Sequence, residues 1–420
     1  MRYALLSLLI VASANADVFR ILDDPRDAAQ SRVDLIQQAR SEIDAVYFLA
    51  RNDRITLTAL ALLRDARRRG VDNVRLIVDA NSLHIPKAVL AHLREEGVQI
   101  RVYHPLTLRH PLWVFTRMHE KLVVVDGQRY ITGGRNLAEA YFGMAKMNYV
   151  DRDVYVDGPS AVEADRHFEN LWSSADVVDL HAHVSESELR RASNVLDDIL
   201  NNLQCGDGFV SLNTGTDWSA GQRDVAAVHL LHDPLATEDG PRVGARLTDL
   251  IASAEESIVI ESPYVVPSKS LLDVLAAKAA AGVSVLIVTN SLRSADGVLA
   301  QAAYLKYRHR VARAGIDIRE FKGPDSLHAK SIVIDARIVL VGSYNVDPRS
   351  QNLNTEVMCM ADDAETARDL LQSIDVHVRN AWRVDIDGRA PREVFPGERA
   401  KSFRAWFARV LLLPVIEGQL

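Results

Sequence analysis

Apolar positions follow two alternating patterns in the first half of the chain. Stretches with a period near 3.6 residues predict helices, and short runs rich in β-branched residues predict strands. The predicted helices cover residues 31–43, 57–69 and 86–96, and the predicted strands cover 45–49, 74–78, 98–103 and 130–132. Gly70 and Gly97 follow helical stretches and mark their ends. The alternation is typical of an α/β fold with mixed or parallel strand pairing.

The same order of elements returns later in the chain. The predicted helices there cover 247–256, 271–281 and 299–314, and the predicted strands cover 257–261, 283–288 and 316–321. A single repeat of about two hundred residues indicates an internal duplication and not a solenoid. We expect a first half over 17–180, a connector over 181–236 with a helix at 185–203, and a second half over 237–420.

One polar motif occurs once in each half. His119 is followed by Lys121 and Asp126, and His328 is followed at the same spacing by Lys330 and Asp335. Glycine steps follow both copies at the same distance, as Gly133-Gly134-Arg135-Asn136 and Gly342-Ser343-Tyr344-Asn345. A lone His-x-Lys is usually structural, but two matched sets in one chain indicate a shared functional site.

The residues around each motif predict how its side chains are directed. Residues 122–125 and 331–334 are apolar and β-branched, so each motif lies at the start of a buried strand. Because strand side chains alternate between faces, each histidine points the same way as the lysine two residues later. Asp126 and Asp335 have the opposite parity, so we predict structural carboxylates there. Glycine in the following step permits close approach of the backbone to a ligand.

Two histidines, two lysines and two asparagines brought together would suit a phosphate diester. Lysines are point charges for the non-bridging phosphate oxygens. A histidine titrates near neutral pH, so one can attack phosphorus while the other protonates the leaving oxygen. The predicted phosphate-binding residues are Lys121, Lys330, Asn136 and Asn345, with Gly134 and Ser343 beside them.

The pattern of the two motifs resembles the phospholipase D superfamily over most of the chain after residue 17. The resemblance implies two homologous α/β/α sandwich halves with mixed sheets, related by a pseudo-twofold axis, with the active site at their interface. It also implies a covalent phosphohistidine and neither a metal ion nor another cofactor. In the superfamily an acidic residue beyond each motif fixes the histidine tautomer, which assigns Asp153 to His119 and Glu356 to His328, or the two crosswise.

Further segments are similar to bacterial cardiolipin synthases. They are 342–350, 352–356, 133–137 with Tyr141, and 261–264. This resemblance implies transfer or hydrolysis on a phospholipid at a membrane surface, with water or an alcohol as acceptor. A nuclease with the same motifs is the alternative, but a net charge of −7 lacks the basic excess of a nucleic-acid binder. A non-enzymatic membrane-binding protein would not need both motifs intact.

The two ends of the chain bear on where it acts. Arg2, the apolar residues 4–13 and Ala14-Asn15-Ala16 form the pattern of a secretory signal over residues 1–16. We therefore expect an exported, periplasmic or secreted protein, peripheral to a membrane. Near the C-terminus aromatic residues and basic residues alternate at helical spacing, which suits either a helix in a lipid interface or one packed on the core.

The remaining cysteines and histidines give weak signals. Cys205 and Cys359 could form one disulfide or none. His181 and His183 lie in a polar connector with no third ligand nearby, which argues against a metal pair. The loop at 113–115 before His119 could contact a lipid or belong to the core.

Overall fold

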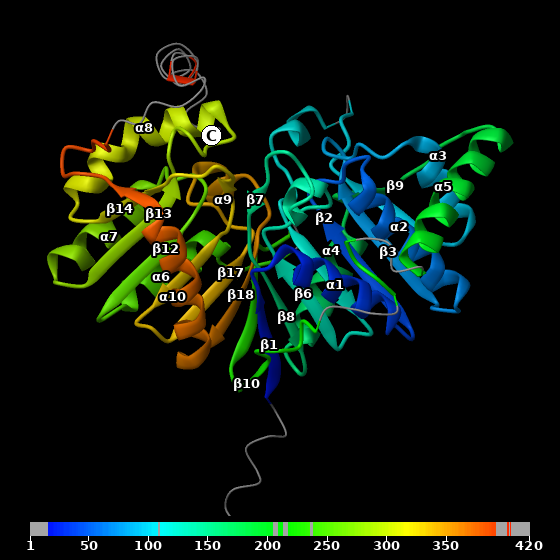
Figure 1. Ribbon diagram of the computed structural model, residues 1–420, viewed down its shortest axis with the longest axis horizontal. Helices are drawn as coiled ribbons and strands as arrows, with labels where there is room; N and C mark the ends of the chain where they lie inside the picture. Colours follow the sequence, from blue (N-terminus) through cyan, green and yellow to red (C-terminus); the bar gives the residue numbers. More distant parts are fainter. Residues whose placement is uncertain are drawn as a thin grey trace, which may run out of the picture.

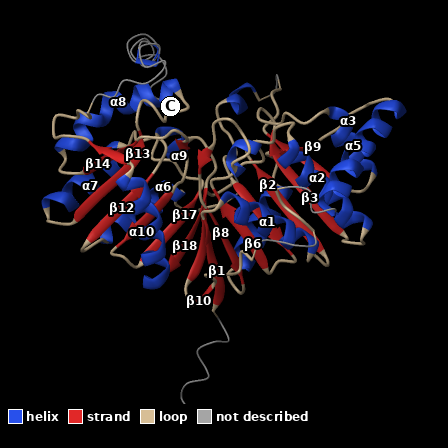
Figure 2. Cartoon of the chain, in the orientation of Figure 1, coloured by secondary structure: helices blue, strands red, loops and turns tan. Residues whose placement is uncertain are grey.

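Two β-sheets lie side by side in the computed structural model, and their central strands meet near the middle of the molecule (Figure 1). The structure describes residues 16–107, 110–204, 209–212, 217–235, 238–391, 401–402 and 404. Strands form the interior and helices lie outside them (Figure 2). None of the helices in these described ranges is long and apolar enough to cross a bilayer.

The first sheet has nine strands in the order β10-β1-β8-β6-β5-β2-β3-β4-β9. Its strands are β1 (Asp17–Leu22), β2 (Glu42–Tyr47), β3 (Asn73–Asp79), β4 (Gln99–Tyr103), β5 (Lys121–Val125), β6 (Arg129–Gly133), β8 (Asp153–Asp157), β9 (Val177–Asp179) and β10 (Arg223–Val225). The associated helices are α1 (Pro25–Gln37), α2 (Arg54–Arg68), α3 (Lys87–Glu95), α4 (Ala161–Ser173) and α5 (Glu186–Gln204), with 3₁₀ turns η1 (Pro111–Val114) and η2 (Glu139–Phe142).

The second sheet has eight strands in the order β11-β18-β17-β16-β12-β13-β14-β19. Its strands are β11 (Val228–His232), β12 (Ser257–Glu261), β13 (Ser284–Asn290), β14 (Asp317–Phe321), β16 (Ser331–Ile334), β17 (Ile338–Gly342), β18 (Val357–Asp362) and β19 (Ala381–Arg383). Its helices are α6 (Val243–Ser253), α7 (Lys269–Ala280), α8 (Val298–Arg313), α9 (Pro348–Asn352) and α10 (Ala364–Arg379).

The strand orders confirm the internal duplication. Apart from β10, the first sheet from β1 to β9 corresponds strand for strand to the second sheet from β11 to β19. In each sheet three neighbouring strands are parallel, β2-β3-β4 and β12-β13-β14, and the other pairs are antiparallel. A short parallel pair, β7 (Tyr149–Val150) with β15 (Ser326–Leu327), joins the two halves.

Three hydrophobic cores hold these layers together. One packs α1, α2, α3 and α5 on the outer face of the first sheet, and another packs α6, α7 and α8 on the outer face of the second. The third lies between the sheets and contains residues of both, together with α4 and α10. Burial of both faces of each sheet explains why its strands are continuous apolar runs.

Some boundaries differ from the sequence prediction. The first helix begins at Pro25 and not at residue 31, because the Asp24 side chain caps the amides of Arg26 and Asp27. Neither the edge strand β10 nor its neighbour β1 was predicted. The expected connector is also divided between the halves: α5 packs on α2 and α3, β10 joins the first sheet, and β11 opens the second.

Several sequence predictions lie outside the described residues. These are the signal at 1–15, Cys205, and the C-terminal helix apart from 401–402 and 404. Cys359 is a buried free thiol, and its Sγ lies 3.3 Å from the hydroxyl of Tyr130 in the other half.

Candidate active site

Each motif histidine lies directly before a central strand and is held by a loop from the opposite half. The backbone N–H of His119, ahead of β5, donates to the carbonyl of Thr355 at 3.0 Å. The backbone N–H of His328, ahead of β16, donates to the carbonyl of Val150 at 2.7 Å. These reciprocal bridges place the loop before β18 against the first motif and the loop before β8 against the second.

The same loops supply the acid that binds each imidazole. His119 Nδ1 lies 3.0 Å from Glu356 Oε2, and His328 Nδ1 lies 2.6 Å from Asp151 Oδ2. Both carboxylates are fully buried at the side chain, and both histidine side chains are about nine-tenths buried. An acceptor at Nδ1 leaves Nε2 as the reactive nitrogen. The pairing is therefore crosswise between halves.

The structure corrects the prediction that Asp153 orients a histidine. The Asp153 carboxylate accepts from the guanidinium groups of Arg32 at 2.9 Å and Arg135 at 3.1 Å. It is a buried ion-paired group that fixes the loop after β6. Asp151, two residues earlier, was not predicted as the histidine partner.

Strand register explains the correction. Gly133 pairs with Asp153 across β6 and β8, and Gly342 pairs with Met358 across β17 and β18. The position equivalent to Glu356 is therefore Asp151. Counting back along β8 from Asp157 and along β18 from Asp362, which pair with Arg129 and Ile338, gives the same equivalence.

Gly134 and Ser343, which were expected beside the phosphate, lie against the Asp151 and Glu356 carboxylates. A Cβ on Gly134 would come within 2.0 Å of Asp151 Oδ1, so only glycine leaves room for that side chain. At the equivalent position the Ser343 hydroxyl donates to Glu356 Oε2 at 2.5 Å. Each half therefore uses the second residue of its glycine step to place an acid.

The two lysines lie with their histidines at the bottom of the site. Lys121 and Lys330 are each 1% exposed, and each Nζ donates to the backbone carbonyl of the histidine two residues before it. Lys330 Nζ also lies 3.1 Å from His328 Nε2. Parity thus places each lysine on the same side as its histidine, as the sequence predicted.

The two asparagines differ from one another. Asn136 accepts from the amide of Leu49 at 3.1 Å and donates to the Tyr141 hydroxyl at 2.9 Å, so its side chain braces the loop. Asn345 is 6% exposed, and its Oδ1 has no hydrogen-bond partner among the described residues. Asn345 is therefore the better candidate to contact a ligand.

Burial and mutual charge shift the pKa values of the site. Burial lowers the pKa of Lys121 to about 7 and that of Lys330 to about 8, although Glu356 and Asp151 oppose the effect. Burial lowers the pKa of His119 well below its ordinary value, and the charges of Lys121, Lys330 and His328 add to this. These couplings cross between the halves, so the two motifs form one electrostatic site.

The two acids differ in protonation. Burial raises the pKa of Glu356 to about 7, with Lys121 and the hydroxyl groups of Ser343 and Ser350 opposing it. Burial also acts on Asp151, but the charges of His328 and Lys330 bring its pKa below the ordinary value. Asp151 is therefore ionised at neutral pH, whereas Glu356 titrates there.

Asp126 and Asp335 have structural contacts, as their parity suggested. Asp126 accepts from the backbone amides of residues 40–42, and Asp335 accepts from those of residues 255–257. Burial raises the pKa of each, but the amide donors bring it below the ordinary value. Each aspartate ties a β-turn to the start of the neighbouring strand.

Aromatic rings and a second acid–histidine pair complete the surroundings. Phe48 contacts His119 edge-on at 5.0 Å between ring centroids, and Tyr149 contacts His328 at the same distance. Glu120, on the opposite face from His119, accepts from His167 Nε2 at 2.7 Å behind the strand. The sequence reasoning missed these residues, because helix α4 and the loop at 141–149 reach the site only through the tertiary fold.

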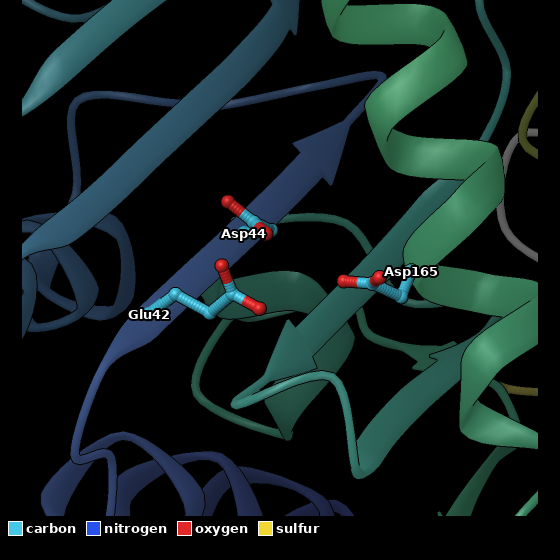
Figure 3. Close-up of side chains that lie close together, drawn as sticks. All are labelled: Glu42, Asp44 and Asp165. Atoms are coloured by element: carbon cyan, nitrogen blue, oxygen red, sulfur yellow. The ribbon is translucent and has the colours of Figure 1, made fainter.

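A group of three carboxylates lies away from the histidines. Glu42 and Asp44 on β2 and Asp165 on α4 point toward one another (Figure 3), with one oxygen of each within 4.8 Å of the others. Arg75 Nε lies 2.6 Å from Asp44, and the same guanidinium reaches Glu169 at 2.5 Å. The Arg75 guanidinium therefore already supplies a positive charge to this group, and these residues are better explained as an ion-pair network than as a metal site.

Comparison with known proteins agrees with this geometry. The family described as "Cardiolipin synthase, PLD-like domain" matches residues 33–172 and 247–378. Cardiolipin synthase C of Escherichia coli is 28% identical over 87% of this chain and 86% of its own length. The major cardiolipin synthase ClsA of Bacillus subtilis is 27% identical over 84% of this chain and 67% of its own. An uncharacterised protein of Helicobacter pylori is 27% identical over 87% and 80%.

A solved structure shares the fold of this chain. The crystal structure of phosphatidylserine synthase from Haemophilus influenzae matches 97% of this chain over 98% of its own length, with a TM-score of 0.71 and 14% identity. Two matched half-sheets with paired His-x-Lys motifs define an enzyme of the phospholipase D superfamily. Within it, the chain belongs to the family of cardiolipin synthase phospholipase D-like domains.

Proposed function

We propose that this protein transfers a phosphatidyl group, from a phospholipid to an alcohol or to water, through a covalent phosphohistidine. The observation that carries the proposal is the crosswise pairing of two histidines with two buried carboxylates, His119 with Glu356 and His328 with Asp151. The likeness to cardiolipin synthases supports a phospholipid as the substrate. Synthesis of a diphosphatidyl product is the specific form of this reaction that the relatives' names suggest.

In the first step His119 is the nucleophile. Its pKa lies well below the ordinary value, so its imidazole is neutral at pH 7 and Nε2 carries a lone pair. An ionised Glu356 accepts a hydrogen bond from the Nδ1–H group and holds the ring in that tautomer. A bond forms between Nε2 and phosphorus as the bond from phosphorus to the leaving alcohol oxygen breaks.

His328 handles the proton in both steps. Burial and the charge of Lys330 lower the pKa of His328, and the ionised Asp151 opposes both effects. Asp151 thereby stabilises the imidazolium that protonates the departing alcohol. The neutral His328 then removes a proton from water or from an acceptor alcohol, whose oxygen attacks phosphorus and displaces His119. Lys121, Lys330 and Asn345 stabilise the negative charge on the phosphate oxygens in the transition states.

We place the reaction at a membrane surface on an exported enzyme. The signal-like pattern at the N-terminus supports export. Apolar residues on the loop before His119 support contact with lipid, since Leu106 is 69% exposed, Val114 40% and Phe115 37%. Fractionation of cells that express the tagged full chain tests this, and recovery in the cytosolic fraction alone would contradict it.

The central test is an assay of the purified full chain with phosphatidylglycerol in mixed micelles. A chloroform-extractable diphosphatidyl product indicates transfer to a lipid alcohol, and phosphatidic acid with free glycerol indicates hydrolysis. Absence of both products, with degradation of DNA, would favour the nuclease instead. Enzyme labelled with ³²P-phospholipid and denatured at alkaline pH, where the P–N bond is stable, should carry the label on the peptide that contains His119; label on His328 would reverse the two roles.

A further inference from the structure

Two pockets flank the catalytic centre at equivalent positions of the duplicated halves. Ala50 pairs with Leu137 in the first half, and Val265 pairs with Val346 in the second. Leu137 and Val346 lie at the same distance in sequence after His119 and His328. One pocket opens just beyond each pairing, of about 450 Å³ in the first half and about 360 Å³ in the second. These volumes lie within the range of small-molecule sites.

The duplicated pockets have opposite chemistry. The first contains Arg51, Asp53, His84 and Glu139. The second is lined by Val266, Val298, Leu299 and Ala303, with polar groups mainly at Tyr264 and on the segment of Asp347 and Arg349. The residue following the paired alanine or valine shows the divergence directly, since Arg51 in one half corresponds to Val266 in the other.

The apolar pocket is connected to the catalytic centre at two points. The Tyr264 hydroxyl donates to Asp296 at 2.8 Å, and Asp296 also hydrogen-bonds Tyr149, whose ring centroid lies 5.0 Å from that of His328. On the other wall, Asp347 and Arg349 belong to the segment that directly follows Asn345. A group bound in this pocket would therefore lie next to a phosphate held between the histidines.

The rim of the same pocket continues to an exposed apolar surface. Arg349 Nη2 donates to the backbone carbonyl of Phe115 at 3.1 Å. Phe115 and its neighbour Val114 are both exposed, on the long loop that only the first half carries before its motif. The apolar pocket thus lies between the catalytic centre on one side and the exposed apolar loop at 114–115 on the other.

We propose that the pocket between the loop at 264–266 and the start of α8 binds an acyl chain of the phospholipid whose phosphate reacts at the histidines. This inference rests on the proposed function and names the part of the substrate that the second half recognises. The pocket of the first half contains four titratable side chains, and an acyl chain there would remove them from water at a cost in free energy. The mainly apolar lining of the second pocket carries a smaller cost of this kind.

The test compares two substrates with the Leu299→Glu variant of the full chain. Leu299 lies in the first turn of α8, where an acidic residue is compatible with the helix dipole, so the fold should persist. We expect kcat/KM for dioleoyl phosphatidylglycerol in mixed micelles to fall roughly ten-fold or more relative to kcat/KM for bis(p-nitrophenyl) phosphate. An unchanged ratio of the two values, whether or not overall activity falls, would overturn the proposal.

Two control variants separate the possible outcomes. Leu299→Met keeps the volume and polarity of the side chain and should show the wild-type ratio of lipid activity to soluble-diester activity. Ala140→Glu adds the same charge to the pocket of the first half and should leave that ratio at the wild-type value. If the wild-type enzyme cleaves the soluble diester but no phospholipid, the proposed function itself is wrong. If the wild-type enzyme acts on phospholipid and Leu299→Glu does not change that activity, only the acyl-chain proposal is wrong.

Discussion

The two histidine–carboxylate pairs descend from one duplicated unit, yet their surroundings differ. Asp151 lies among cations, with His328, Lys330 and Arg135 lowering its pKa. Glu356 is held by Ser343 and Ser350, which are neutral donors, and burial raises its pKa to about 7. The backbone frame therefore sets the distances in both halves, whereas the neighbouring side chains decide which carboxylate is ionised.

In the proposed mechanism the two histidines have separate roles. Burial lowers the pKa of both, but an ionised Asp151 opposes this at His328, the proposed proton donor, whereas the charges of Lys121 and Lys330 add to it at His119, the proposed nucleophile. The flanking pockets differ as well, since the first contains Arg51, Asp53, His84 and Glu139, whereas the second is mainly apolar with Asp347 and Arg349 on one side. The two halves therefore share a backbone frame and differ in the side chains that surround it.

Replacing either histidine should have the largest effect. His119→Ala and His328→Ala should each lower kcat/KM for phospholipid by roughly 10³-fold or more, since each removes a reacting group. With an aryl phosphodiester, whose leaving group needs no proton, His328→Ala should still form the phosphoenzyme and His119→Ala should not. Near-normal turnover of phospholipid by either variant would show that the site is assigned wrongly.

The carboxylates should rank next, with unequal effects. Asp151→Asn removes an ionised partner and should lower kcat by about 100-fold, whereas Glu356→Gln should cost about ten-fold. Steady-state kinetics at pH 7, with circular dichroism to verify folding, would measure both. Equal losses would mean that the two pairs are electrostatically alike despite their different neighbours.

The pH profile should sharpen the contrast. Glu356 must be ionised, which requires a pH above its pKa of about 7, while Lys121 and Lys330 bind phosphate when charged, below their pKa values of about 7 and about 8. A plot of kcat/KM against pH should therefore be a narrow bell centred near neutrality. Glu356→Gln should remove the acidic limb and leave the alkaline limb. An unchanged acidic limb in that variant would assign it to another group.

The smallest effect on turnover is expected at Asp153. Asp153→Asn leaves Arg32 and Arg135 buried without their counter-charge and should cost about 3–5 kcal/mol of unfolding free energy. Its kcat per folded molecule should stay within about two-fold of wild type, because it does not contact either histidine. Urea unfolding and active-site titration by phosphoenzyme burst would measure these separately. A large loss of kcat in the folded fraction would mean that Asp153 acts on catalysis through Arg135 and its loop.

Much of the fold was readable from local pattern. Residues 257–261 were predicted as a strand with the bounds that β12 has, and most other elements matched within a few residues. The errors arose where local signals were overlooked or weak, as at the Asp24 cap of α1, or where pairing partners are distant, as at the edge strand β10 and its neighbour β1. Both strands pair with segments far along the chain, and such pairing leaves little local signal in the sequence.

The sequence alone determined the duplication, the α/β class, the two histidines with their lysines, and the structural role of Asp126 and Asp335. These follow from spacing and strand parity, which are local properties of the chain. Only the tertiary structure decided that Asp151 and not Asp153 binds a histidine, that each acid reaches across to the opposite half, and that Gly134 leaves room for one of them. Contacts between residues about two hundred positions apart depend on strand register and on the packing of the two sheets, and neither leaves a periodic signal in the sequence.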